Sequence, residues 1–270
     1  MKKIIIIGSN GKIGNRLVKE LGSNNIIYTD EKKNLNNLIN KDFINSKKID
    51  AIINCIGSYK DNKSFYVSNF YIPGLISKRL SDLNNFLSKE IIFIHISSIG
   101  VNDPYSSFNL KPIDLDINKK TKINYDLYEF SKSAAEFIIK NNLENKENIN
   151  TILLRPSNLI FKKSNFLFKL KIFLIFFPFK FPQGKKIPLT PIDYLNKKIL
   201  SYLNKDFTDS FLSTNTYTRI KLSEIMGKHK FINNFKITMN DKLATYIINF
   251  LPEISFLKSI KRILIFISFL

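Results

Sequence analysis

Cysteine and histidine are scarce in this chain of 270 residues, which has one cysteine, Cys55, and two histidines, His95 and His229. A single cysteine cannot form an internal disulfide, and it cannot supply the paired thiolates of a structural zinc site. Two histidines are also few for a histidine-ligated metal centre, so we expect no bound metal. A reducing compartment fits this composition.

Acidic residues are outnumbered, because 22 Asp and Glu stand against 42 Lys and Arg, which gives a formal net charge of +20. Such a field attracts nucleic acid, anionic lipid or a phosphorylated substrate. The lysine content has a second interpretation, since Lys, Asn, Ile and Phe all have AT-rich codons and are abundant together, while tryptophan is absent. Both interpretations stay open. No arginine-rich patch or nucleic-acid motif stands out, so nucleic acid is not an expected partner.

Long apolar runs are missing. The stretches 172–177 and 263–270 are far shorter than the roughly 20 residues that span a bilayer. Each could lie in a membrane interface or pack on the body of the protein, and we favour packing. The apolar run 4–7 ends at once in a glycine loop, unlike a secretory signal. We therefore expect a cytoplasmic protein, and peripheral contact with a membrane stays open.

Short β-branched runs alternate with helical stretches along the chain. The expected strands are 4–7, 26–29, 51–56, 91–96 and 151–154, and the expected helices include 15–21, 64–87 and 125–141. This alternation predicts an α/β fold, a Rossmann-type doubly wound parallel sheet with a small C-terminal substrate lobe. Because the pattern changes after Arg155-Pro156, we expect a dinucleotide-binding domain at 1–160. A substrate-binding lobe and C-terminal helices, interleaved with the main domain, are expected at 161–270.

A glycine-rich loop follows the first expected strand and opens the first expected helix. Glycines allow a tight turn and a close approach of the backbone to a pyrophosphate, and the helix N-terminus offers N–H groups to that anion. We predict that the loop binds a dinucleotide through Gly8, Asn10, Gly11, Lys12, Ile13 and Gly14. The end of the third strand is expected to pass close to the same cofactor with Asn54, Cys55, Ile56 and Gly57.

Asp30 closes the second expected strand. A carboxylate at this point can accept hydrogen bonds from the adenosine ribose diol, which favours NAD over NADP. Lys32 and Lys33 follow closely and could instead hold a 2′-phosphate. We favour NAD, and NADP stays open.

Tyr128 and Lys132 are four residues apart, so they share one face of the expected helix 125–141. A tyrosine with an ordinary pKa of about 10 is a poor base at neutral pH, but a neighbouring ammonium and a positively charged nicotinamide favour its phenolate. The spacing alone is common in a lysine-rich chain. The context selects this pair, because it follows a strand that ends in Ser97 and Ser98. Those serines either face the cofactor or cap a turn.

Taken in order, the glycine loop, Ser97-Ser98, Tyr128 with Lys132, and Leu154-Arg155-Pro156 resemble the motifs of extended short-chain dehydrogenases/reductases, the NAD-dependent epimerase/dehydratase family. The resemblance implies that Ser98 hydrogen-bonds the reacting oxygen and that Tyr128 exchanges a proton with it. It implies that Lys132 holds the nicotinamide ribose and tunes Tyr128.

The resemblance also assigns supporting residues. Asn69 would support the active-site helix beside the cofactor, and Arg155 and Asn158 would border the substrate. Asn54 and residues 69–74 are similar to the dehydrorhamnose-type 4-keto reductases, and residues 179–189 are similar to nucleotide-sugar 4-epimerases.

The implied function is that of an NAD(P)-dependent enzyme acting on a nucleotide-linked sugar, as a 4-epimerase or 4-keto reductase in surface-polysaccharide biosynthesis. A basic lobe would suit a diphosphate-bearing substrate. The family often has a Tyr-Gly pair where this chain has Asn102-Asp103, and 162–186 is unusually apolar and basic, which leaves the substrate open. Two alternatives remain: a dehydrogenase of a lipid-like alcohol, suggested by 166–177, and a non-catalytic NAD(P)-binding assembly or regulatory subunit. A homodimer also stays open.

Overall fold

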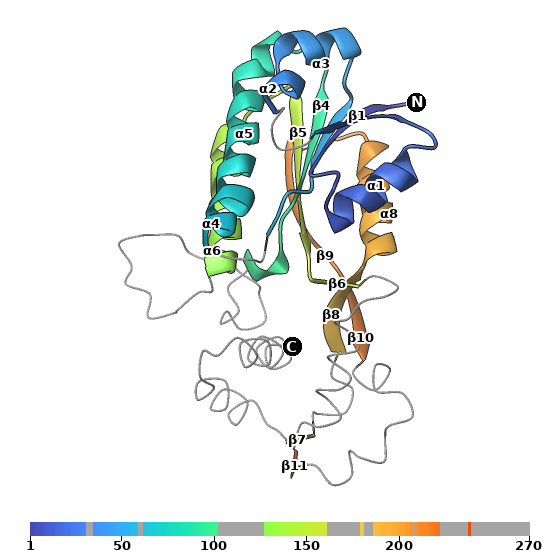
Figure 1. Cartoon of the computed structure of the whole chain (residues 1–270), viewed down its shortest axis with the longest axis vertical. Coiled ribbons are helices and arrows are strands. Elements are labelled where there is room, and N and C mark those ends of the chain that lie inside the picture. The colour runs from blue at the N-terminus through green and yellow to red at the C-terminus, as the bar shows by residue number, and fades with distance from the viewer. Residues whose placement is uncertain are drawn as a thin grey trace, which may run out of the picture. The chain divides into compact units, whose positions relative to one another are not determined.

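Two compact units make up the chain, the first from Met1–Ser157 with Asp193–Thr216 and the second from Asn158–Ile192 with Tyr217–Leu270. Figure 1 shows the computed structural model. It describes residues 1–30, 35–58, 62–101, 127–160, 179–180, 186–207, 209–221 and 237–238.

A parallel sheet of six strands forms the centre of the first unit, in the spatial order β2-β1-β3-β4-β5-β9. All neighbouring strands in it are parallel. The strands are β1 (Lys3–Ile7), β2 (Ile26–Asp30), β3 (Ala51–Asn54), β4 (Ile91–Ile96), β5 (Ile149–Pro156) and β9 (Phe211–Thr216). The order reverses between β1 and β3, because the chain adds β2 on one side of β1 and β3 on the other. In open sheets of this kind ligands bind at such a switch point, beyond the carboxyl ends of the strands.

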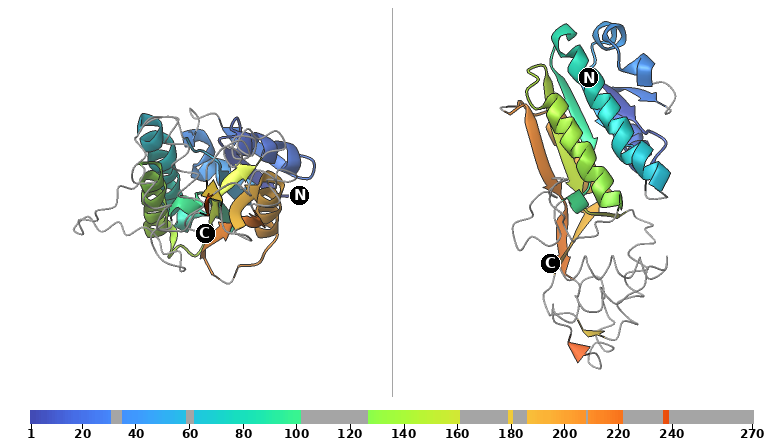
Figure 2. Two further views of the ribbon diagram at one scale, coloured as in Figure 1. Left: turned by 90° about the horizontal axis from the view of Figure 1, so that it is seen from below. Right: turned by 90° about the vertical axis from the view of Figure 1, so that its left-hand side faces the viewer.

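Helices cover both faces of this sheet, so the expected doubly wound α/β fold is confirmed (Figures 1 and 2). One face carries α3 (Lys41–Lys47), α5 (Ile72–Leu83) and α6 (Leu127–Leu143), and the other carries α1 (Lys12–Leu21) and α8 (Ile192–Leu203). Short helical turns complete the unit: α2 (Leu35–Leu38), α4 (Asn62–Ser64), η2 (Asn84–Phe86) and η3 (Ile99–Val101).

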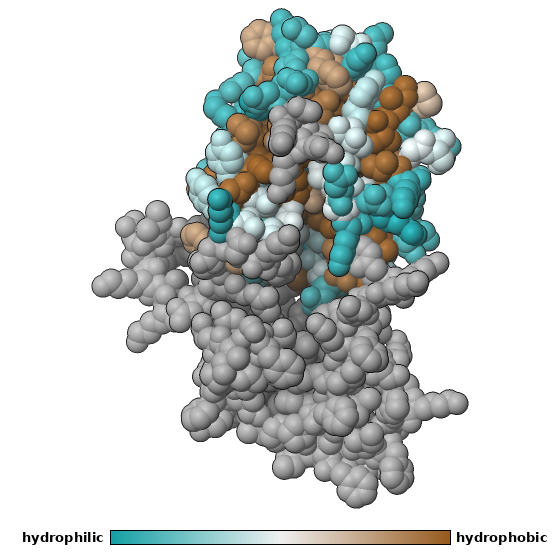
Figure 3. Space-filling view, viewed as in Figure 1, coloured by the Kyte–Doolittle hydropathy of each residue, from teal (hydrophilic) through white to brown (hydrophobic). Residues whose placement is uncertain are grey.

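The isoleucines of β1 explain why the sheet needs two helical layers. Ile4, Ile5, Ile6 and Ile7 are all 0% exposed, so neighbouring side chains are buried on opposite faces. Full burial of each such side chain contributes about 1.5–3 kcal/mol relative to exposure. Polar side chains, drawn in teal, cover much of the outer surface of this unit in Figure 3.

One helix differs from its expected form. The sequence predicts a single helix over 64–87, but the structure divides this stretch among α4, the π-helix η1 (Phe65–Tyr71), α5 and η2. Pro73 lies in the first turn of α5. Proline has no N–H for the carbonyl four residues earlier, and its ring crowds that carbonyl, so a wider turn before it relieves the clash.

The second unit contains two small sheets. The strand order of the larger is β10-β8-β6, made of β6 (Asn158–Ile160), β8 (Lys186–Pro191) and β10 (Thr218–Lys221). The smaller pairs β7 (Phe179–Lys180) with β11 (Ile237–Thr238). Residues Asp193–Thr216, which contain most of α8 and all of β9, belong to the first unit, so the chain returns to this unit after the expected boundary at 160. That the second unit binds substrate stays a prediction.

None of the helices in the described part of the chain combines the length and the apolar character that a membrane-spanning helix requires. The apolar stretches 172–177 and 263–270 lie outside the described residues, so their packing or interfacial position stays a prediction.

Candidate active site

The glycine loop between β1 and α1 has the geometry of a phosphate-binding turn. Gly8 has a φ of +82°, a conformation that side chains disfavour. A Cβ on Gly14 would collide with the Gly8 carbonyl oxygen and lie 2.8 Å from Ser9 Cα. The N–H of Gly11 donates to the Gly8 carbonyl at 3.0 Å, which closes the turn. The first and third glycines are therefore required by the backbone itself.

Helix α1 begins directly behind this turn with Gly11 as its N-cap. Gly11 supplies no side-chain cap, and the first turn contains no acidic residue. The amino end of α1 thus keeps the positive end of its dipole toward the loop, which is the arrangement that attracts an anion. Asn10, Gly11 and Lys12 are exposed there, as a site for a phosphate requires.

The segment after β3 packs against the glycine loop. A Cβ on Gly8 would lie 2.9 Å from Ile56 Cγ1, so Ile56 closes the space beside the turn. Gly57 lies on the other side of this segment, where an added Cβ would be 3.4 Å from Lys132 Nζ. The predicted cofactor residues 54–57 therefore lie between the glycine loop and the lysine.

A buried Asn54–His95 pair holds this segment. Asn54 Oδ1 accepts a hydrogen bond of 3.1 Å from the N–H of Ile56, and Asn54 Nδ2 lies 3.1 Å from His95 Nδ1. Since the amide nitrogen must donate, His95 Nδ1 accepts and the imidazole carries its proton on Nε2. Burial and the charge of Lys132 lower the pKa of His95 well below its usual value, so the ring is neutral. The ring lies in the core, with 0% exposure.

Asn69, on the π-helix, connects three parts of the site. Its Oδ1 accepts from the N–H of Ser58 at 2.8 Å, and its Nδ2 donates to the Ser58 carbonyl at 3.0 Å and to Ser131 Oγ at 3.2 Å. Ser131 Oγ donates in turn to the Tyr128 carbonyl at 2.7 Å. Asn69 is 0% exposed, so these bonds are shielded from water.

Tyr128 and Lys132 lie one helical turn apart on the inner face of α6, with 7% and 3% exposure. Lys132 Nζ donates to the Ile96 carbonyl at 3.0 Å, at the carboxyl end of β4. Burial lowers the pKa of Lys132 to about 8, against the opposing effects of Glu136 and Cys55. The Phe65 ring contacts the Tyr128 ring edge-on, with 6.0 Å between the two ring centroids. The structure thus brings the predicted tyrosine and lysine to the strand end where the cofactor segment lies.

The two serines after β4 have different surroundings. Ser97 is 4% exposed, and its Oγ has no hydrogen-bond partner within the described part of the chain. Ser98 is half-buried, and its Oγ accepts from the N–H of Gly100 at 3.2 Å. The turn η3 packs against α6, since an added Cβ on Gly100 would lie 3.0 Å from Glu129 Cγ. Ser98 therefore lies between β4 and the start of the helix that carries Tyr128.

Arg155, predicted to border the substrate, is engaged within the first unit. Its guanidinium forms a buried ion pair with Glu136 of α6. Asn158 begins β6 in the second unit, opposite Leu189 of β8. A substrate contact by either residue stays a prediction.

Several residues of this network escape sequence reasoning. Ser131 and the Ile96 carbonyl carry no sequence signal, because their contacts join elements far apart in the chain. Glu136 could have been found, since it lies four residues after Lys132 and so on the same helical face. The Asp30 side chain, Lys32, Lys33, Asn102, Asp103 and His229 lie outside the described residues. Among the described residues there is no cluster of metal-ligating side chains.

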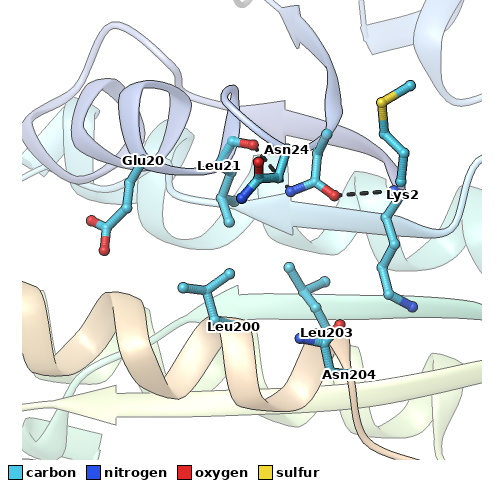
Figure 4. Close-up of a pocket in the computed structure, with 9 residues that line it drawn as sticks. Lys2, Glu20, Leu21, Asn24, Leu200, Leu203 and Asn204 are labelled. Atoms are coloured by element: carbon cyan, nitrogen blue, oxygen red, sulfur yellow. Dashed lines mark hydrogen bonds between the residues drawn. The ribbon is translucent and has the colours of Figure 1, made fainter.

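A cavity of about 320 Å³ lies away from this site, at the start of β1 and the end of α1 (Figure 4). Leu200 and Leu203 of α8 face Glu20, Leu21 and Asn24 across it. It lies at the amino ends of the strands, whereas the glycine loop and Lys132 lie at the carboxyl ends. The cavity therefore takes no part in the candidate active site.

No protein-family model matches this sequence, and no curated protein matches it. Solved structures do share its architecture. The dTDP-4-dehydrorhamnose reductase of Bacillus anthracis, in complex with NADP, has a TM-score of 0.57 and 21% identity over 88% of this chain and 84% of that chain. The UDP-glucuronic acid 4-epimerase of Bacillus cereus, in complex with NAD, has a TM-score of 0.57 and 18% identity over 88% and 86%.

A third similar structure is the dTDP-4-dehydrorhamnose reductase of Yersinia enterocolitica, with a TM-score of 0.58 and 16% identity over 90% of this chain and 85% of that chain. At such identities a likeness establishes the fold. The chain therefore shares the fold of these reductases and of this epimerase along most of its length.

Proposed function

We propose that this protein is an NAD(P)-dependent oxidoreductase or epimerase that acts on a nucleotide-linked sugar, as a 4-keto reductase or a 4-epimerase. The observation that carries the proposal is the convergence of three elements at the carboxyl ends of β1, β3 and β4. There the glycine loop, the Asn69 network and the Tyr128–Lys132 pair meet through contacts among buried groups.

The residues present fit a dinucleotide. Because Gly14 has no Cβ, the start of α1 packs closely on the backbone of the turn, and the uncapped N-terminus of the helix stands beside it, an arrangement that suits a pyrophosphate. Gly8, Asn10, Gly11, Lys12, Ile13 and Gly14 would hold the phosphates, and residues 54–57 would border the nicotinamide half. A bound dinucleotide supplies hydride transfer. Asp30, at the end of β2, favours NAD in this proposal, and NADP remains an alternative.

The chain's own residues supply the proton chemistry. Lys132, held by the Ile96 carbonyl, puts a positive charge one helical turn from Tyr128, and this charge favours the phenolate form of that tyrosine. Tyr128 can then exchange a proton with the reacting oxygen of the sugar, and Ser98 hydrogen-bonds the same oxygen. The burial of Tyr128 and Lys132 excludes bulk water from this exchange.

The substrate class comes from two sources. Reductases and an epimerase of nucleotide-linked sugars have this fold. A net charge of +20 would attract a diphosphate. We propose the second unit, with Asn158, as the substrate-binding part, and Arg155 as a residue at its border. Surface-polysaccharide biosynthesis, a cytoplasmic location, peripheral membrane contact and a homodimer stay parts of this proposal that need their own tests.

The first experiment is a fluorescence titration of the purified protein with NADH and NADPH, followed by mass analysis of any nucleotide that co-purifies. A retained NAD would favour an epimerase, because an epimerase regenerates its cofactor in each cycle. Exchangeable binding would favour a reductase, whose oxidation of the reduced cofactor is then followed with dTDP- and UDP-linked 4-keto sugars. Absence of binding to either nucleotide would refute the proposal. Binding without turnover of any sugar nucleotide would favour a non-catalytic subunit.

A further inference from the structure

We propose that Glu136 is a positioning residue that keeps Lys132 protonated at neutral pH, and that Arg155 fixes Glu136 in place for this task. The inference deepens the proposed function and rests on it, because it concerns the lysine of the same site. It also gives Arg155 a role inside the first unit, apart from any contact with substrate.

The ion pair between Arg155 and Glu136 has a two-pronged geometry. Arg155 Nε donates to Glu136 Oε1 at 3.0 Å and to Oε2 at 3.1 Å, and Arg155 Nη2 donates to Oε2 at 2.5 Å. The exposed fractions of the two side chains are 13% and 9%. Arg155 belongs to β5, which is paired on both sides, with β4 and β9, so the guanidinium is anchored by a rigid strand. Such a pair holds the carboxylate in one position.

Glu136 is also placed to act on Lys132. The two residues are one helical turn apart on α6, and both are buried, at 7% and 3% exposure. Within the described part of the chain, the Lys132 ammonium donates to one backbone carbonyl, that of Ile96. A buried ammonium with so little solvation needs a compensating negative charge to stay protonated.

Among the residues that the structure describes, the groups that act on Lys132 leave Glu136 as the source of that charge. Cys55, after β3, has its pKa raised to about 12 by burial, with Lys132 acting in the opposite direction, so it is a neutral thiol. His95, on β4, is a neutral imidazole because burial and Lys132 lower its pKa. Tyr128, on α6, is the group that Lys132 is proposed to tune. Of these neighbours, Glu136 alone is a carboxylate.

The loss of this carboxylate would leave the lysine neutral under physiological conditions. Burial lowers the pKa of Lys132 to about 8, and Glu136 is the larger of the two influences that oppose this effect. Without Glu136 the pKa would fall further, so much of Lys132 would be uncharged at neutral pH. A neutral Lys132 would no longer favour the phenolate of Tyr128.

The test measures the protonation of Lys132 without cofactor or substrate. The free energy of unfolding is measured by denaturant titration from pH 5 to 11 for the full chain and for Lys132→Met. The unfolded lysine has a pKa of about 10.4, so between the folded and unfolded values the native state binds fewer protons. The wild-type chain therefore gains stability relative to Lys132→Met as the pH rises through this window. The lower end of the window marks the pKa of Lys132 in the folded protein.

Glu136→Gln should move this lower end toward acid by about one pH unit or more, because the removed charge lies one helical turn away. The matched control is Glu144→Gln, directly after the last residue of the same helix. Its carboxylate pairs with exposed Lys140, so the change should leave the window in place. If Glu136→Gln does not fold, the double variant Glu136→Gln with Arg155→Met also removes the buried guanidinium that pairs with Glu136, and it should show the same displacement.

An unchanged window in the Glu136 variants would overturn the inference, even if the protein binds NADH as proposed. A displaced window in a protein that binds neither NADH nor NADPH would reject the proposed function and retain the electrostatic coupling. Where wild-type turnover is measurable, the weaker charge on Lys132 should move the acid-side fall in activity toward higher pH in Glu136→Gln, opposite to the window, and leave it fixed in Glu144→Gln.

Discussion

Asn69 and Ser131 are joined by a hydrogen bond of 3.2 Å although 62 residues separate them. The same Asn69 side chain binds both backbone groups of Ser58, and Ser131 binds the carbonyl of Tyr128. One buried amide thus ties the segment after β3 to the turn of α6 that carries the tyrosine and the lysine. Asn69 therefore contributes to the position of Tyr128 relative to the cofactor segment.

Replacement of Asn69 by alanine should therefore damage both stability and cofactor binding. Ser58 and Ser131 would each lose their hydrogen bonds to Asn69, which costs about 1–3 kcal/mol of unfolding free energy. Asn142→Ala is the control, because the Asn142 amide of α6 forms a similar bond of 2.9 Å to Ser77 of α5. Denaturant titration should show loss in both variants, whereas fluorescence titration should show weaker NADH binding in Asn69→Ala alone. Equal NADH affinity in the two variants would contradict the assigned role of Asn69.

Removal of the Tyr128 hydroxyl should abolish proton exchange and spare cofactor binding. Tyr128→Phe should lower turnover by about 10²–10⁴-fold, the usual contribution of a positioned acid or base. Tyr66→Phe makes the same change on an exposed side chain of η1 and should leave turnover unaltered. Steady-state rates and NADH titrations of both variants decide the matter. Wild-type turnover by Tyr128→Phe would remove this residue from the mechanism.

A methyl group on Gly14 should distort the glycine turn that is proposed to bind the phosphates. Its Cβ would overlap the Gly8 carbonyl, so Gly14→Ala must displace the loop and should weaken dinucleotide binding about tenfold or more, equivalent to about 1.4 kcal/mol. Gly74→Ala on α5 serves as the control. There the new Cβ would meet Ile138 Cγ2 at an ordinary 3.5 Å, and alanine favours the helix by up to about 1 kcal/mol. Calorimetric titration of NADH should separate the two variants, and normal binding by Gly14→Ala would discredit the loop as a cofactor site.

Asp50 should contribute stability that is lost in acid. It accepts hydrogen bonds of 2.6 Å from Lys89 Nζ and from the N–H of Lys3. Burial acts to raise the pKa of Asp50, but these two bonds and the nearby lysine charges hold it below its usual value. A carboxyl with a lowered folded pKa stabilises the fold above its unfolded pKa, and the effect disappears as the pH falls through the folded value. Asp50→Asn should cost about 1 kcal/mol at pH 7, and the difference from wild type in denaturant titrations should shrink below about pH 4. A difference that stays constant from pH 7 to 3 would refute this account.

Buried strands and backbone-determined turns were the features that the sequence predicted well. The isoleucines of β1 form one uninterrupted apolar run because both faces of the strand are covered. The glycine loop is readable because its constraints are local, with Gly8 and Gly14 in contact within a few residues. The same holds for Tyr128 and Lys132, whose shared face follows from helical spacing.

Contacts between distant segments could not be predicted in this way. The partner of Arg155 is set by which helix covers β5, so a resemblance at the Leu-Arg-Pro motif suggested a substrate contact while the structure gives Glu136. The hydrogen bond between Asn54 and His95 depends on β3 lying beside β4 in one register. The π-helix around Asn69 depends on crowding by Pro73, which the apolar periodicity of 64–87 does not reveal.

The reactivity of the Cys55 thiol can be used to measure local unfolding of the segment after β3. It is the sole cysteine of the sequence, and burial raises the pKa of its thiol to about 12. Thiol-reactive dyes attack the thiolate, which is nearly absent at neutral pH in the folded state. A dye should therefore label native protein slowly and at one site, and the labelling rate should follow the separation of the β3 segment from Lys132. No introduced probe is then needed to detect local unfolding at the candidate active site.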